Sequence, residues 1–408
     1  MDYVKPADVA AAMVDTGRRK LGLAPADLLI RGALAGGILA AATSLAFTGM
    51  VQTGQPLVGA LIFPVGLILI VLLGLDLVTG SFGLLPLPCI EKTGDPRTMF
   101  MNWVYVFTGN LLGSMAYGAL LAIALTNFGT AAPAGVAAKI VAIAEAKTIG
   151  YAAIGHAGLI TVFVKAMLCN WMVCLAIVAA MTTNSTIGKI ATAYMPVFIF
   201  FAQGFEHSVV NMFVIPTGMM MGAKVTVADW WLWNQIPVTL GNLIGSMAYG
   251  ALLAIALTNF GATAPAGVAA QIIAIAQAKT TGYAALGFAG MVTVFVKAML
   301  CNWMVCLAIV MTMTSASTVG KIAAAWMPML IFFGQGFEHS VVNMFVIPTG
   351  MLMGAKVTVA DWWLWNQIPV TLGNLVGGAV FTGLALYITH KPRKSMAPLT
   401  SPTQVPAE

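Results

Sequence analysis

The chain has 408 residues, of which 60% are hydrophobic and only 8% are charged, and its mean hydropathy is +0.93. A soluble domain of this size cannot bury so much apolar surface, so the composition predicts an all-α, polytopic membrane protein. The net charge of +6 does not indicate nucleic acid as a partner, but on so few charges it favours anions over cations at a pore mouth. The five cysteines lack the spacing of a metal site or a disulfide framework, so neither a metal nor a cofactor is expected.

Residues 1–28 are polar and charged, and their apolar positions recur at helical spacing. We expect an amphipathic helix that lies on the cytoplasmic face of the cell's inner (plasma) membrane and no cleavable signal peptide. The basic residues Arg18, Arg19 and Lys20 also predict a cytoplasmic amino terminus by the positive-inside rule.

About nine apolar spans follow, starting near residues 29, 57, 102, 151, 195, 233, 283, 327 and 365. The second contains the stretch GLDLVTGSFGLLPLPC at 74–89, and the fifth is interrupted by Gly204, Pro216 and Gly218. These residues predict helices broken at membrane depth. Broken backbone persists there only where protein or a water-filled cavity satisfies its polar groups, so the breaks indicate a pore.

Residues 109–240 align without a gap to residues 241–372, with 22 differences over 132 positions. Each copy holds three spans, and the related phrases GNLLGS, GNLIGS and GNLVGG begin at Gly109, Gly241 and Gly373. The spacing of their glycines predicts close helix packing. The likeness of the third and sixth spans indicates an older pseudo-symmetry between two three-helix halves.

The stretch GFEHSVVNMFVIPTGM occurs in both copies and places Glu206 beside His207 in an apolar run. Ionisable groups inside a membrane are rare and usually functional. On a regular helix the two side chains would diverge by about 100°, so one faces the path and the other supports it. We favour His207 as the group that faces the path, and the alternative is a histidine with only a structural hydrogen bond. Lys165 either attracts anions or extends its amine to the membrane surface.

The phrases GLILIVLLGLDLVTGS, CNWMVCLA, GFEHSVVNMFVIPTGM and NQIPVTLGN together resemble the formate/nitrite transporter family. The resemblance implies an aquaporin-like bundle of six helices, two of them broken, assembled as a pentamer. It implies a path for small weak-acid anions and protons rather than an enzyme. It assigns His207 as the central pore histidine, Asn170 as its hydrogen-bonding neighbour, and Thr79 as the residue at the break of the second helix.

The same resemblance implies an outer constriction, an inner constriction and a vestibule lysine. The outer constriction would consist of Leu77 and Val173, and the inner one of Phe63, Leu67 and Phe200. The vestibule lysine would be Lys165. The second copy repeats part of the set as Lys297, Asn302, Val305, Phe332 and His339.

The chain departs from the family in its three additional spans. We expect a cytoplasmic segment at 1–28, a six-helix channel unit at 29–260, a duplicated three-helix segment at 261–390 and a disordered tail at 391–408. The predicted function is a channel or transporter for formate, nitrite or a similar monovalent anion, with the histidine assisting proton-linked permeation. A non-transporting or defective scaffold is the alternative, and the sequence leaves open whether the path is a channel or a proton symporter.

Nine spans place the two chain ends on opposite sides of the membrane, although Lys391, Arg393 and Lys394 favour a cytoplasmic carboxyl end. We expect residues 1–260 to form the pore, with the last three spans beside it as an inverted extra half. The competing arrangement pairs residues 1–108 with the second copy.

Overall fold

The computed structural model of the chain describes residues 2–245 and 267–390. Helices dominate these residues, and their one β-bridge joins Tyr3 to Thr183. Five helices are long and apolar enough to cross a membrane, which supports a multi-pass membrane protein. They are Pro25–Thr53, Pro96–Thr126, Gly155–Met181, Gly287–Met313 and the composite helix Val359–His390.

The helices up to Thr126 are called the amino-terminal half, because they form one three-span half of the expected six-span unit. This half begins with the surface helix α1 and then contains two long helices and a broken one. The elements are α1 (Pro6–Leu21), α2 (Pro25–Thr53), α3 (Pro56–Ile62), α4 (Val65–Leu72), α5 (Val78–Leu84), α6 (Pro86–Ile90) and α7 (Pro96–Thr126). The break between α4 and α5 occurs where the second span was predicted to be interrupted. Helix α1 packs on α5 and α6, and a Cβ on its Gly17 would lie 2.6 Å from the Leu84 carbonyl oxygen.

The first copy of the repeat adds three further helical passages. They comprise α8 (Val136–Ala146), α9 (Ile149–Ala152), α10 (Gly155–Met181), α11 (Thr186–Ala202), α12 (Ser208–Met220), α13 (Val227–Trp230), the π-helix η1 (Trp231–Gln235) and α14 (Ile236–Ile244). The fifth span breaks between Ala202 and Ser208, as Gly204 predicted. Pro216 and Gly218 do not interrupt it, because both lie inside α12, which continues to Met220.

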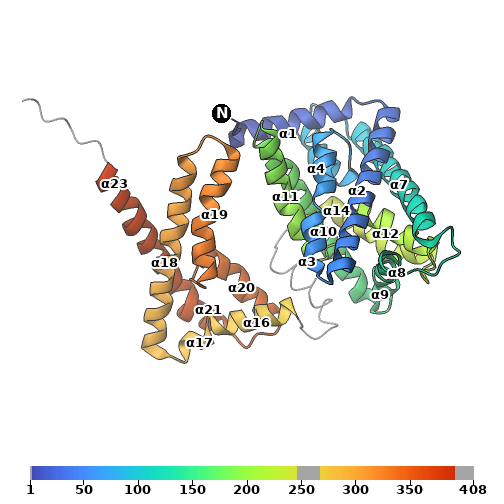
Figure 1. The fold of residues 1–408 in the computed structure, drawn as a ribbon. Coiled ribbons are helices and arrows are strands. Elements are labelled where there is room, and N and C mark those ends of the chain that lie inside the picture. The colour runs from blue at the N-terminus through green and yellow to red at the C-terminus, as the bar shows by residue number, and fades with distance from the viewer. Residues whose placement is uncertain (1, 246–266, 391–408) are drawn as a thin grey trace, which may run out of the picture.

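The second copy repeats this series as a separate body (Figure 1). It contains α16 (Val268–Ala278), α17 (Thr281–Ala284), α18 (Gly287–Met313), α19 (Thr318–Gly334), α20 (Ser340–Leu352), α21 (Val359–Trp362), η2 (Trp363–Gln367), α22 (Ile368–Val376), η3 (Gly377–Leu384) and α23 (Ala385–His390). Helix α19 contacts α11 of the first copy. The predicted boundary at residue 260 and the predicted disordered tail at 391–408 lie outside the described residues.

The glycines of the repeated GNL phrase lie where helices touch, as predicted. A Cβ on Gly109 would approach the Leu29 carbonyl oxygen to 2.5 Å, and one on Gly241 would approach the Phe163 carbonyl oxygen to 2.5 Å. Only glycine permits backbones this close. The phrase therefore locks α7 against α2 and α14 against α10.

Candidate functional site

The two helix breaks meet where the amino-terminal helices pack on the first copy of the repeat. Thr79, at the start of α5, places its Oγ1 3.3 Å from Nε2 of His207, the residue that precedes α12. Both side chains are buried, and 127 residues of chain separate them. The structure thus joins two positions that the resemblance had assigned to one path.

The backbone at the second break is extended, with φ −112° and ψ 120° at His207. Successive side chains of an extended segment point to opposite sides, so Glu206 and His207 diverge more strongly than on the helix assumed from sequence. His207 approaches Thr79, whereas Glu206 binds an ionic cluster. The two side chains therefore contact different groups, and which of them faces a path stays a prediction.

One asparagine caps each half-helix that leaves a break. Asn110 on α7 accepts a hydrogen bond from the Val78 N–H and donates to the Asp76 carbonyl oxygen, both at 2.9 Å. Asn242 on α14 accepts from the Ser208 N–H and donates to the Glu206 carbonyl oxygen, again both at 2.9 Å. The equal contacts confirm the pseudo-symmetry that the GNL phrase indicated.

Glu206 is the centre of a buried cluster on one side of the histidine. Its carboxylate forms an ion pair with Lys147 at 2.6 Å and accepts hydrogen bonds from the Tyr151 hydroxyl at 2.9 Å and the Asn211 amide at 2.8 Å. Lys165 donates to the Tyr151 hydroxyl at 3.3 Å. Two lysines and one carboxylate leave a formal charge of +1, which suits a monovalent anion.

Lys147 and Tyr151 were not predicted from the sequence as site residues. Lys147 directly follows the short helix α8 and Tyr151 lies in α9, where a lysine and a tyrosine look like ordinary surface residues. The available signal was that both recur unchanged in the second copy, as Lys279 and Tyr283.

Asp76 and Lys20 form a second buried pair beside the first break. Lys20 comes from the surface helix α1, and its backbone carbonyl accepts a hydrogen bond from the Asn102 amide at 2.9 Å. By the pseudo-symmetry, Asp76 before Leu77 corresponds to Glu206 before His207. A lysine therefore neutralises the carboxylate at each break.

Aromatic side chains cover one side of His207. The ring of Phe200 stacks on the imidazole with centroids 5.8 Å apart, and Phe63 meets Phe200 edge to face at 5.7 Å. Leu67, a neighbour of Phe63 in sequence, lies in the same core cluster. A cavity of about 640 Å³ lies here, lined by His207, Phe200 and the ionic cluster.

Leu77 and Val173 are also buried in this cluster, with 4% and 1% of their surfaces exposed. That Leu77 and Val173 form an outer constriction, and that Phe63, Leu67 and Phe200 form an inner one, stays a prediction.

Asn170 differs from what the resemblance implied. Its amide donates to the Asn242 backbone carbonyl rather than to His207. Asn242 in turn holds the Ser208 N–H, so Asn170 is linked to the break through the cap of α12. Its Oδ1 is buried and has no hydrogen-bond partner among the described residues.

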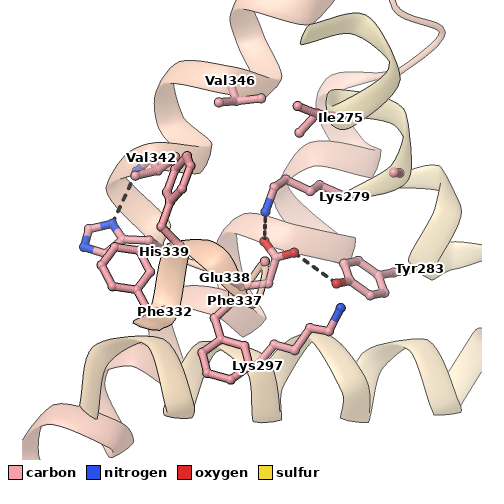
Figure 2. Close-up of a pocket in the computed structure, with 13 residues that line it drawn as sticks. Ile275, Lys279, Tyr283, Lys297, Phe332, Phe337, Glu338, His339, Val342 and Val346 are labelled. Carbon is pink, nitrogen blue, oxygen red and sulfur yellow. Dashed lines mark hydrogen bonds and ion pairs between the residues drawn. The ribbon is translucent and has the colours of Figure 1, made fainter. Parts of the chain in front are cut away.

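The second copy reproduces the cluster (Figure 2). Lys279 forms an ion pair with Glu338 at 2.8 Å, and the Tyr283 hydroxyl donates to Glu338 at 3.0 Å. Lys297 and His339 line the same cavity of about 370 Å³.

The remaining predicted residues of the second copy keep their local places. The ring of Phe332 stacks on His339 at 5.9 Å, and Asn302 donates to the Asn374 carbonyl at 2.6 Å. Val305 is half-buried on α18. The sequence has a single stretch like 74–89, so Thr79 and Leu77 cannot serve both copies, and in the structure Thr79 contacts His207 of the first.

The formate/nitrite transporter family model matches the chain twice, over residues 7–256 and 248–388. A probable formate transporter of Methanothermobacter thermautotrophicus is 36% identical over 62% of this chain and 96% of its own length. A formate channel of Bacillus thuringiensis is 30% identical over 61% of this chain and 93% of its own.

A solved ion channel of the same family superposes with a TM-score of 0.52 at 28% identity, covering 60% of this chain and 96% of that channel. The two family matches, one per copy, agree with the duplication read from the sequence. The chain is therefore a multi-pass membrane protein of the formate/nitrite transporter family.

Proposed function

We propose that the first six-helix unit carries formate, nitrite or a related small weak-acid anion across the membrane, assisted by His207. The observation that carries this proposal is the contact of His207 with Thr79, where two broken helices meet beside a cluster of net positive charge. The relatives are transporters and channels, which favours transport over the scaffold alternative and over an enzyme.

The two lysines of the ionic cluster differ in how freely they can attract an anion. Lys147 is held by Glu206, whereas Lys165 contacts only the hydroxyl and ring of Tyr151 in the described contacts. Lys165 is therefore the cation more available to an entering anion. This role agrees with the vestibule lysine of the resemblance.

The geometry at His207 favours one neutral tautomer. The Val210 N–H donates to Nδ1 at 3.3 Å, so Nδ1 must be unprotonated and the proton resides on Nε2. Nε2–H then points at Thr79 and can donate to a passing anion in place of the hydroxyl. Full protonation of the ring would break the cap that Nδ1 provides to α12.

A bare anion that leaves water for an apolar constriction loses solvation of several kcal/mol, and of order 20 in the idealised low-dielectric limit. A proton that joins the anion removes most of this barrier. We infer that Lys165 gathers the anion, that Nε2–H of His207 binds it, and that a proton from water or through the imidazole lets it cross as the acid.

The assembly and orientation follow from family membership as proposals. They are a homopentamer in the inner membrane, an aquaporin-like arrangement of the six-helix unit, nine spans and a cytoplasmic amino terminus. Apolar side chains on the outer surface of the unit, such as Leu120 and Leu112 on α7, suit contact with lipid or with a neighbouring subunit.

Replacing His207 by Asn tests the role of the imidazole. An Asn side chain still caps a helix, so α12 keeps its N-terminal acceptor while the ring is lost. We expect His207→Asn to abolish proton-linked formate uptake into liposomes, and the matched variant His339→Asn to retain it. Full uptake by His207→Asn would refute the proposed role.

A further inference from the structure

The two copies of the repeat do not differ at random along their length. Ten of the 22 differences fall within residues 179–202, the end of α10 and the whole of α11. Residues 161–178 are identical to their counterparts, and residues 203–240 differ only at Met220. The copies have thus kept the histidine and its ionic partners, while their differences gather in two stretches, the ten in 179–202 and eight more in residues 139–160.

Helix α11 is the part of the first copy that packs on α3 and α4 of the amino-terminal half. The Tyr194 hydroxyl donates to the Leu61 carbonyl at 2.8 Å, and Phe201 stacks on Phe63 with ring centroids 4.0 Å apart. Val197 is fully buried in the same core cluster as Phe63. These contacts hold the first copy to its partner half.

The second copy has changed two of these three contact positions. Trp326 replaces Tyr194, and an indole carries its N–H on the ring edge rather than a hydroxyl at the tip that reaches Leu61. Met329 replaces Val197, where a longer side chain must enter a fully packed site. In the structure both side chains are on the surface of α19, with 59% and 37% of their area exposed.

One amino-terminal half faces two nearly identical candidate partners in every chain. The residues of the second break are identical in the two copies, so they cannot determine which copy pairs with the amino-terminal half. We propose that the substitutions in α19, chiefly Tyr194 to Trp326 and Val197 to Met329, direct the amino-terminal half to the first copy and so determine which histidine meets Thr79. This inference concerns the pairing of the helices and does not depend on which solute is carried.

Thiol cross-linking of the full chain tests the pairing. In a background without native cysteines, two proteins carry Phe63→Cys with either Phe201→Cys or Phe333→Cys, which are equivalent positions of the two copies. A short bis-maleimide reports the pairing as product in which one linker joins both cysteines, identified by its mass, with monomer and dimer products counted alike. We expect at least tenfold more product from the first protein than from the second.

The reciprocal exchange leaves the first copy intact. Reverting the second copy at five positions of α19 should raise cross-linking of Phe63→Cys to Phe333→Cys to the level of the first pair. The five changes are Ala324→Thr, Trp326→Tyr, Met329→Val, Leu330→Phe and Gly334→Ala. Because the first copy is unchanged, a folded six-helix unit remains available in this variant.

Exchanges in the first turns of α18 serve as the matched control. Leu286→Ile, Phe288→His, Met291→Leu and Val292→Ile restore first-copy residues away from the contact with α3 and α4, and we expect them to leave the product ratio unchanged. The inference is overturned if the α19 exchange leaves the ratio where it was, or if the α18 exchange shifts it equally.

Discussion

The ion pair between Lys147 and Glu206 has an internal control, because the second copy contains the same pair as Lys279 and Glu338. In each pair the lysine side chain is 18% exposed and the carboxylate 2% exposed. We consider Lys147→Met and Lys279→Met, which remove the charge and keep most of the side-chain volume. Both variants leave a buried carboxylate without its cation.

Breaking a buried ion pair by removing one partner costs about 3–5 kcal/mol. Glu206 keeps the Tyr151 hydroxyl at 2.9 Å and the Asn211 amide at 2.8 Å, so the lower end of this range, about 3 kcal/mol, is expected. Lys279→Met should cost a similar amount because Glu338 keeps the equivalent Tyr283 and Asn343. Equilibrium unfolding in mixed detergent micelles measures both values.

The two variants should differ in their effect on formate uptake. Lys147→Met lowers the net charge of the cluster of Lys147, Lys165 and Glu206 from +1 to 0, and formate uptake into liposomes should fall on the order of tenfold. Lys279→Met alters a cavity that lacks Thr79 and should leave uptake per folded protein within about twofold of the unmodified chain, on the same electrostatic grounds. Equal loss of uptake in both variants would refute the assignment of the path to the first copy.

Three further outcomes are expected. Replacing Asn242 by Ala removes the acceptor of the Ser208 N–H and should destabilise the fold by about 1–3 kcal/mol and lower uptake. The equivalent change Asn374→Ala should lower stability alone. Equal uptake defects in the two variants would contradict this expectation. Proton-linked uptake should rise as the external pH falls from about 7 to about 5, because a proton must join the anion before it crosses the apolar constriction, and a flat profile would indicate simple anion conduction. A single cysteine at Ser401 should react with a membrane-impermeant thiol reagent on intact cells if the chain has nine spans, and protection together with a cytoplasmic amino terminus would show that this span count is wrong.

The sequence by itself determined the class of the protein, because composition and apolar runs respond directly to a lipid environment. It also predicted a break in the stretch that begins at Gly74 and another at Gly204, together with the repeat and the histidine, since each of these features is local in the sequence. Pro216 and Gly218 were wrongly included in the second break, because a proline or a glycine can lie inside a membrane helix whose neighbours satisfy the freed backbone groups.

Only the tertiary structure decided which distant groups meet. Lys147 pairs with Glu206 across 59 positions, and Thr79 reaches His207 across 128. Neither pairing follows from periodicity, because periodicity fixes the face of one helix and not the neighbour that covers it. The choice between two nearly identical copies is also tertiary: the residues of the second break are the same in both, and the first copy is distinguished by its packing on the amino-terminal helices, α11 on α3 and α4 and α12 on α2 and α7.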